Sequence, residues 1–300
     1  MEGRAGEQGR GRLSALELTC ADASLRLCAR GAEMRAWRAG GLDLLWSPDP
    51  SVWNAVSPVL FPVVGWCRDG MARAKGLARP MPVHGFAAAR DFACARIDDA
   101  RMRFQLEDDA GTRAHYPYRF QLTLEYALEP RALTIEARVS NPGDEPMPYA
   151  FGLHPGFRWP LFGAAAQAHR IVFAQAEAAH TPVIAPGGLF SQARRPVPLE
   201  GRALPLAPEL FAQEALCFLD AHSRSLAYEG PAGAIEAEAE GFAHWALWSR
   251  PGAPFLCVEA WTGHGDPVGF EGELAQKPSM ILLAPGETRT HRVFFRLRLA

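Results

Sequence analysis

The chain has 300 residues, 48% of them hydrophobic, which is enough apolar material for one large β domain or two ordinary domains. Its formal net charge is −2, from 31 basic and 33 acidic residues, so no positive excess favours a nucleic-acid partner. The sequence lacks a run of about 18 apolar residues, and its charged start lacks the apolar core of a signal peptide. We therefore expect no membrane span and a cytoplasmic location.

The first twelve residues (MEGRAGEQGRGR) are charged and rich in glycine, so we expect a disordered leader over residues 1–12. No low-complexity linker interrupts the rest, which predicts a single domain over residues 13–300. Six cysteines stand at positions 20, 28, 67, 94, 217 and 257 without a CxxC pair. That spacing predicts free thiols in a reducing compartment and no metal site.

Short runs that alternate apolar and polar residues dominate the chain, at residues 25–30, 101–107, 120–126, 133–139 and 293–299. A period of two residues is typical of half-buried β-strands. Residues 122–128 are expected to pair with residues 135–139 as a hairpin. The fold class predicted is all-β, a large antiparallel β-sandwich.

Helical patterns are scarce. Residues 164–168 are ambiguous, and residues 232–240 (AGAIEAEAE) fit either a strand or a weak helix. Residues 185–208 are rich in Pro, Gly and Arg, which predicts a long surface excursion.

Two segments carry the chemistry that the sequence suggests. Residues 151–160 (FGLHPGFRWP) place His154 among aromatic residues, and residues 255–266 (FLCVEAWTGHGD) place Glu259 at the end of an apolar run. A histidine and a carboxylate in such settings can act as an acid/base pair without metal or cofactor. Dinucleotide, P-loop, nucleophile-elbow and HExxH motifs are absent from the sequence, which argues against those enzyme classes.

A set of motifs in a fixed order resembles the aldose 1-epimerase family, also called galactose mutarotase-like proteins, and within it the LacX-type branch. The set comprises HGF at 84–86, YPYRF at 116–120, PYAFGLHPGFRWP at 148–160, CVEAW at 257–261 and APGE at 284–287. The resemblance spans about residues 15–298. It implies a supersandwich fold, no cofactor and a reaction that interconverts the α and β anomers of a sugar.

The resemblance also implies roles for individual residues. His154 matches the family's general acid, Glu259 its general base, and His84 the histidine that hydrogen-bonds the sugar. Trp261 follows Glu259 by two residues and is expected near the site. A nearby carboxylate is expected to favour the protonated form of His154.

The chain departs from the family pattern at several of the sugar-binding positions. Trp66 stands where the family commonly has an arginine, so the nearest candidates are Arg68 and, in the longer HGFAAAR motif, Arg90. An acidic sugar-binding residue is expected within residues 211–220, where Glu214 and Asp220 both qualify and Asp220 is retained as the candidate. Gly156 replaces the bulky aromatic residue of the HPYF form.

Three functions remain open. The first is an aldose 1-epimerase that takes a small sugar as a monomer or homodimer. The second is a hexose-6-phosphate 1-epimerase, which predicts that Arg68, Arg73, Lys75 and Arg79 converge on the pocket to receive a phosphate. The third is a sugar-binding protein of the same fold without turnover. His264 and Asp266 are candidate metal ligands together with Glu259. Their spacing is not diagnostic of a metal site, so we expect them to be solvated loop residues.

Overall fold

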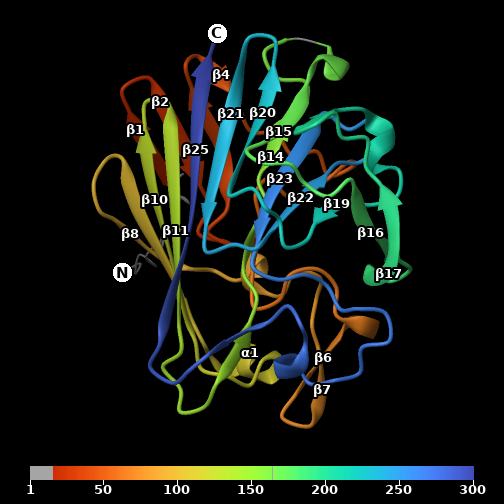
Figure 1. Cartoon of the computed structure of the whole chain (residues 1–300). Coiled ribbons are helices and arrows are strands. Elements are labelled where there is room, and N and C mark those ends of the chain that lie inside the picture. The colour runs from red at the N-terminus through yellow and green to blue at the C-terminus, as the bar shows by residue number, and fades with distance from the viewer. Residues whose placement is uncertain (1–15, 164) are drawn as a thin grey trace, which may run out of the picture.

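The computed structural model describes residues 16–163 and 165–300, so the leader expected over residues 1–12 lies outside the described residues. Antiparallel strands are the main regular structure of the described chain (Figure 1). The helices in this part are α1 (Ala110–His115) and five short 3₁₀ turns. The 3₁₀ turns are Arg68–Gly70, Ala87–Ala89, Ala166–Ala168, Pro208–Phe211 and Leu274–Gln276. None of the helices in the described part of the chain is long and apolar enough to cross a membrane.

A nine-stranded antiparallel sheet forms one side of the molecule (Figure 1). In order across it the strands are β18 (Ala203–Pro205), β15 (Arg170–Phe173), β20 (Ser225–Gly230), β21 (Gly233–Glu240), β25 (Thr288–Leu299), β11 (Ala132–Ser140), β10 (Gln121–Glu129), β9 (Arg101–Glu107) and β8 (Ala93–Arg96).

A second sheet carries the strands that later build the site. Its order is β19 (Leu216–Phe218), β22 (His244–Trp248), β23 (Phe255–Trp261), β13 (Gly152–Leu153) and β5 (Val59–Leu60), and β14 (Gly156–Arg158) also pairs with β23. The two sheets pack face to face. Phe157 of β14 meets Phe295 of β25 with ring centroids 5.5 Å apart, inside one continuous apolar core. The predicted antiparallel β-sandwich is confirmed.

Smaller sheets complete the structure. They are the four-stranded sheet of β1 (Leu16–Cys20), β2 (Ala23–Leu27), β3 (Met34–Ala39) and β4 (Leu42–Asp43), and the strand pairs β6 (Met71–Ala74) with β7 (Leu77–Pro80), β12 (Met147–Tyr149) with β24 (Ile281–Leu283), and β16 (His180–Ala185) with β17 (Leu189–Pro196). The β16–β17 hairpin lies beside β19 at the edge of the second sheet (Figure 1).

The register of β10 and β11 is the one that the alternating pattern predicted. Leu122 lies opposite Val139, Leu124 opposite Ala137, and Tyr126 opposite Ile135. Every second residue of β11 is buried, because successive side chains of a strand point to opposite faces of the sheet. The ambiguous stretch at 232–240 is the strand β21, whose alanines face the core between exposed or half-buried glutamates.

Residues 185–208 lie mostly at the surface, as expected. They are not a plain loop, since they include β17 and β18. Strand pairing with β16 and β15 satisfies the backbone of this segment, despite its content of Pro and Gly.

Candidate active site

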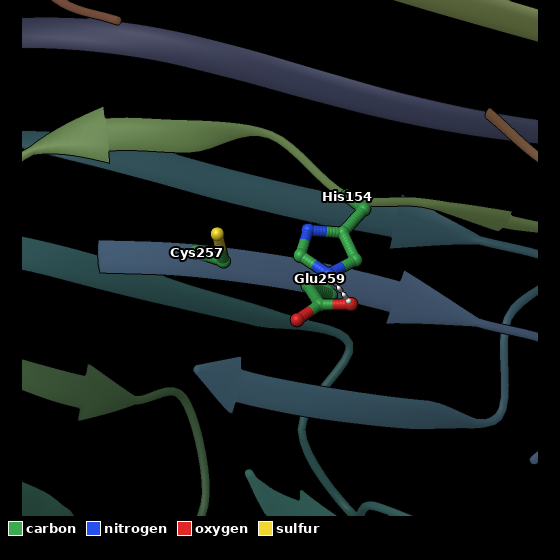
Figure 2. Close-up of side chains that lie close together, drawn as sticks. All are labelled: His154, Cys257 and Glu259. Atoms are coloured by element: carbon green, nitrogen blue, oxygen red, sulfur yellow. Dashed lines mark ion pairs between the residues drawn. The ribbon is translucent and has the colours of Figure 1, made fainter. Parts of the chain in front are cut away.

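His154 and Glu259 meet at the centre of the second sheet. Glu259 belongs to β23, and His154 lies in the short link between β13 and β14, which both pair with β23. The pairing of Leu153 with Ala260 and of Gly156 with Cys257 places the histidine directly over the strand. His154 Nε2 lies 3.2 Å from Glu259 Oε2, and Figure 2 shows the ring above the carboxyl group.

This pair lies in an apolar and aromatic environment. Only 1% of Glu259 and 6% of His154 is exposed. The ring of His154 lies 5.3 Å from that of Trp53 and 5.7 Å from that of Trp248, between centroids. A carboxyl group and an imidazole at such a site are separated from bulk water, which strengthens electrostatic interactions between them and a ligand.

Burial acts on the two groups in opposite directions. It raises the pKa of Glu259 well above its usual range, and together with the nearby His84 ring it lowers the pKa of His154 well below its own. The expectation that the carboxylate holds His154 in its protonated form is therefore not met in the free protein. A carboxylic acid beside neutral imidazole carries the same protons as a carboxylate beside imidazolium, so one proton moving between them interconverts the two states.

Trp261 supports the ionised form of Glu259. It is two residues further along β23, on the same face of the sheet, and its indole Nε1–H donates a hydrogen bond of 3.0 Å to Glu259 Oε2. This bond lowers the pKa of Glu259, but burial acts more strongly. The other ring nitrogen of His154, Nδ1, is buried and has no hydrogen-bond partner among the described residues.

His84 stands next to the pair with its tautomer determined by the backbone. Its Nδ1 accepts a 3.1 Å hydrogen bond from the Gly65 amide, so in the neutral ring the proton is on Nε2. Burial lowers the pKa of His84 to about 4, which keeps the ring neutral at physiological pH. Its ring centroid lies 5.5 Å from that of His154. His84 is therefore placed to donate one hydrogen bond to a ligand beside the pair.

A cavity of about 890 Å³ opens over these residues. Its walls come from the second sheet, from the 58–66 and 83–84 segments, and from the turn of the β16–β17 hairpin. The lining residues include Trp53, Trp66, Val83, His84, His154, Ile184, Pro186, Gly188, Phe190, Phe211, Glu214, Cys217, Trp248, Arg250, Glu259 and Trp261. Mostly aromatic and apolar walls with a few convergent polar groups are typical of a small-molecule site.

The other predicted site residues lie apart from this cavity. Arg68 forms an ion pair of 2.9 Å with Glu271 and lines a separate groove with Arg73. Arg90 lies 3.8 Å from Asp109, and its guanidinium stands over the Phe86 ring.

The side chain of Asp220 is 90% exposed and lines a neighbouring groove. Its backbone amide donates to His244 Nδ1. Of the two acidic alternatives, Glu214 lines the cavity and Asp220 does not.

Sequence reasoning missed Trp53 and Trp248, which flank the histidine. The glycine at position 156 was the sequence feature that could have indicated Trp53, because a missing side chain leaves room for a ring from elsewhere in the chain. A Cβ atom at this glycine would lie 2.9 Å from the Trp53 ring and 3.0 Å from the Trp46 ring. The bulk that relatives are expected to carry at position 156 is here supplied by residues from elsewhere in the chain.

A set of metal-ligand atoms also converges at the pair. His154, Cys257 and Glu259 each offer a donor atom within 4.8 Å of the other two (Figure 2). Cys257, predicted to be a free thiol, is a free cysteine and is buried. His264 and Asp266 belong elsewhere: Asp266 contacts Lys277 and the Arg68 amide, and His264 Nδ1 contacts the Gly265 carbonyl.

Comparison with known proteins agrees with this architecture. The family model described as aldose 1-epimerase matches residues 15–296, nearly the whole chain. The chain belongs to the aldose 1-epimerase family. Among curated relatives, the plasmid-encoded protein LacX of Lactococcus lactis subsp. lactis is 28% identical over 260 residues, covering 83% of this chain and 87% of the relative.

Solved structures of the family share the fold. A galactose mutarotase-like protein from Lactobacillus casei ATCC 334 superposes with a TM-score of 0.87 at 23% identity, covering 94% of this chain and 99% of that chain. Galactose 1-epimerase from Lactobacillus acidophilus NCFM superposes with a TM-score of 0.68 at 14% identity, covering 93% and 92% of the two chains. The second sheet and its cavity are thus part of a mutarotase-type β-sandwich.

Proposed function

We propose that this protein is a cofactor-independent aldose 1-epimerase, which interconverts the α and β anomers of a sugar by opening and closing its ring. The observation that carries the proposal is the contact of 3.2 Å between His154 Nε2 and Glu259 Oε2 on the floor of a cavity with aromatic walls. Both groups titrate, both face the cavity, and their environments shift their pKa values in opposite directions.

In the proposed reaction the two groups act on opposite ends of one hemiacetal. Glu259, as the carboxylate, takes the proton of the C1 hydroxyl, while His154, as imidazolium, gives its proton to the ring oxygen. The bond between C1 and the ring oxygen breaks, and C1 becomes the aldehyde carbon. Rotation about the C1–C2 bond and the reverse proton transfers then close the ring as the other anomer.

The protonation states fit a ligand-dependent switch. In the free protein burial favours the uncharged pair, whereas the reaction needs the charged one. Hydroxyl groups of a bound sugar add hydrogen bonds to the carboxylate, which favour its ionised form together with the Trp261 N–H. The neutral His84 ring supplies a further donor beside the reacting centre.

The phosphorylated-sugar alternative has less support. The basic residues expected at the pocket mouth are not among the cavity lining, and the lining's only arginine in the described part of the chain is Arg250. Arg68 and Arg73 lie over a different groove. A sugar-binding protein without turnover would not need both members of the acid/base pair, although its cavity could be the same.

Polarimetry of freshly dissolved α-D-glucose and α-D-galactose tests the proposal, with wild-type protein and with His154→Gln. Acceleration of the optical change by the wild type, lost in the variant, is the expected result. The same readout with a panel of aldoses and with glucose 6-phosphate separates the alternatives. No acceleration with any of these sugars, while equilibrium binding persists, would replace the epimerase with a binding protein.

A further inference from the structure

An exposed tryptophan stands at the outer wall of the cavity. Trp66 is 45% exposed, whereas Trp261, which also lines the cavity, is 4% exposed. Exposed large apolar side chains elsewhere in the described chain, such as Leu77 and Val268, do not line this cavity. A large ring left open to solvent inside a binding cavity indicates a contact surface for a ligand.

The position of Trp66 is held from two sides. Gly188, in the turn between β16 and β17, packs on the five-membered part of the indole, and a Cβ atom there would lie 1.8 Å from Trp66 Cδ1. Gly188 also has a φ of +74°, which suits glycine. On the backbone side, the Asp266 amide donates to the Trp66 carbonyl at 2.8 Å.

The same wall is tied to the second sheet and to His84. Phe190 of β17 donates its amide to the Asp266 carbonyl, which links the hairpin to the segment that holds Trp66. One residue before Trp66, the Gly65 amide orients the His84 ring. The aromatic wall is therefore pre-organised relative to the reacting pair, and a ligand that uses it does not have to order it.

The cavity is larger than one sugar ring, and it has charged lining residues besides those proposed to act on that ring. A cavity of about 890 Å³ is in the upper part of the range that encloses drug-sized ligands, which are larger than a hexose. Besides Glu259 and the histidines, the charged lining residues are Glu214 and Arg250. A pyranose ring offers C–H groups on its faces and hydroxyl groups at its rim, which match an aromatic face and charged side chains together.

We propose that Trp66 forms an outer subsite that stacks a second sugar ring, so that the substrate is a reducing disaccharide whose reducing-end ring lies at His154 and Glu259. This inference rests on the proposed epimerase function for the inner ring. The reaction is unchanged at the reducing end, and the second ring contributes only to binding.

Titration calorimetry tests the subsite independently of turnover, since an anomerically equilibrated sugar gives no net reaction heat. We would compare glucose and galactose with cellobiose, maltose and lactose, on wild type, Trp66→Ala, Trp66→Phe and Val268→Ala. At least one disaccharide is expected to bind wild type about 10-fold more tightly than its monosaccharide, because aromatic stacking adds to area burial. Trp66→Ala should abolish this preference, and Trp66→Phe should retain most of it.

Val268→Ala is the matched control, because Val268 is exposed but lies outside the cavity lining. It should leave every affinity within about 2-fold of the wild type. Equal affinity for mono- and disaccharides, or an equal loss of both in Trp66→Ala, would overturn the subsite. A disaccharide preference that depends on Trp66, in a protein that accelerates no anomer exchange, would keep the subsite and refute the epimerase.

Discussion

Two buried carboxyl groups close together in the chain have opposite surroundings. Asp266 is 5% exposed and lies 2.9 Å from the ammonium group of Lys277, whose side chain is fully buried. It also accepts a hydrogen bond from the Arg68 amide. Glu259 is 1% exposed, and its hydrogen-bond and ion-pair partners among the described residues are the Trp261 N–H and His154, whose pKa is lowered by burial.

The difference shows that a buried carboxyl group with a cation beside it serves structure, whereas one without a cation can serve a reaction. Asp266 is held in position by the Lys277 ammonium group and by the Arg68 amide. Glu259 lacks such a cation within the described chain, so a ligand or a proton can change its state. Asp266 anchors the wall that carries Trp66 and Phe190, whereas Glu259 is poised for proton transfer.

The largest effect expected from this comparison is on catalysis. Glu259→Gln keeps the shape of the side chain but removes the base, so the rate constant for anomer exchange should fall by about 10²–10⁴-fold in polarimetry. Asp266→Asn is the matched variant, and its folded fraction should keep the wild-type rate. Glu259→Gln protein with a rate within 10-fold of the wild type would remove Glu259 from the mechanism.

The next effect concerns stability. Lys277→Met leaves Asp266 buried without its cation and should lower the free energy of unfolding by about 3–5 kcal/mol, measured from urea denaturation. The chain's other lysine provides the control, because Lys75 is exposed and pairs with the half-buried Glu145. Lys75→Met should cost less than about 1 kcal/mol. Similar losses in both variants would show that the buried pair has no special role.

The pH dependence of stability tests the environment of Glu259. Because the folded-state pKa of Glu259 is raised, the folded protein binds more protons than the unfolded chain above the usual value of 4.5. The free energy of unfolding of wild type, measured relative to Glu259→Gln, should therefore be greatest below pH 4.5 and decrease as the pH rises above it. A difference that grows with pH in this range would contradict the raised pKa.

The smallest effect concerns the indole hydrogen bond. Trp261→Phe removes the donor that lowers the pKa of Glu259, so this pKa should rise further. Because burial gives Glu259 the higher pKa of the two groups and His154 the lower, Glu259 governs the basic limb of the kcat/KM profile. We expect that limb to move to higher pH and the plateau value to fall. An unmoved limb with lower activity at all pH values would assign Trp261 a packing role alone.

Much of the fold follows from local patterns. The alternation in β9, β10, β11 and β25 predicts strands, and the hairpin register of Leu124 with Ala137 follows from which face must be buried. Residues 185–208 lie mostly at the surface, as their Pro, Gly and Arg content predicted, but that content did not reveal the strands formed by pairing with β16 and β15. Backbone pairing depends on a partner that local composition does not reveal.

The predictions for the site were also only partly correct. His154, His84, Glu259 and Trp261 were predicted and line one cavity. Arg68, Arg90 and Asp220 were chosen by position in the chain, and each side chain is directed to neighbours outside the cavity. Long side chains can turn either way from a given backbone position, so proximity in sequence does not decide which surface they serve.

By itself the sequence determined the strand-rich fold, the family and the pair of residues that can exchange protons, because alternating polarity and ordered motifs are written along the chain. The tertiary structure alone decided the contact of 3.2 Å between His154 and Glu259 and the place of Trp66 against Gly188. It also decided that Asp266 has a cation beside it, which Glu259 lacks among the described residues. Burial and charge compensation arise from groups that distant segments bring together, and the pKa values that govern the chemistry follow from them.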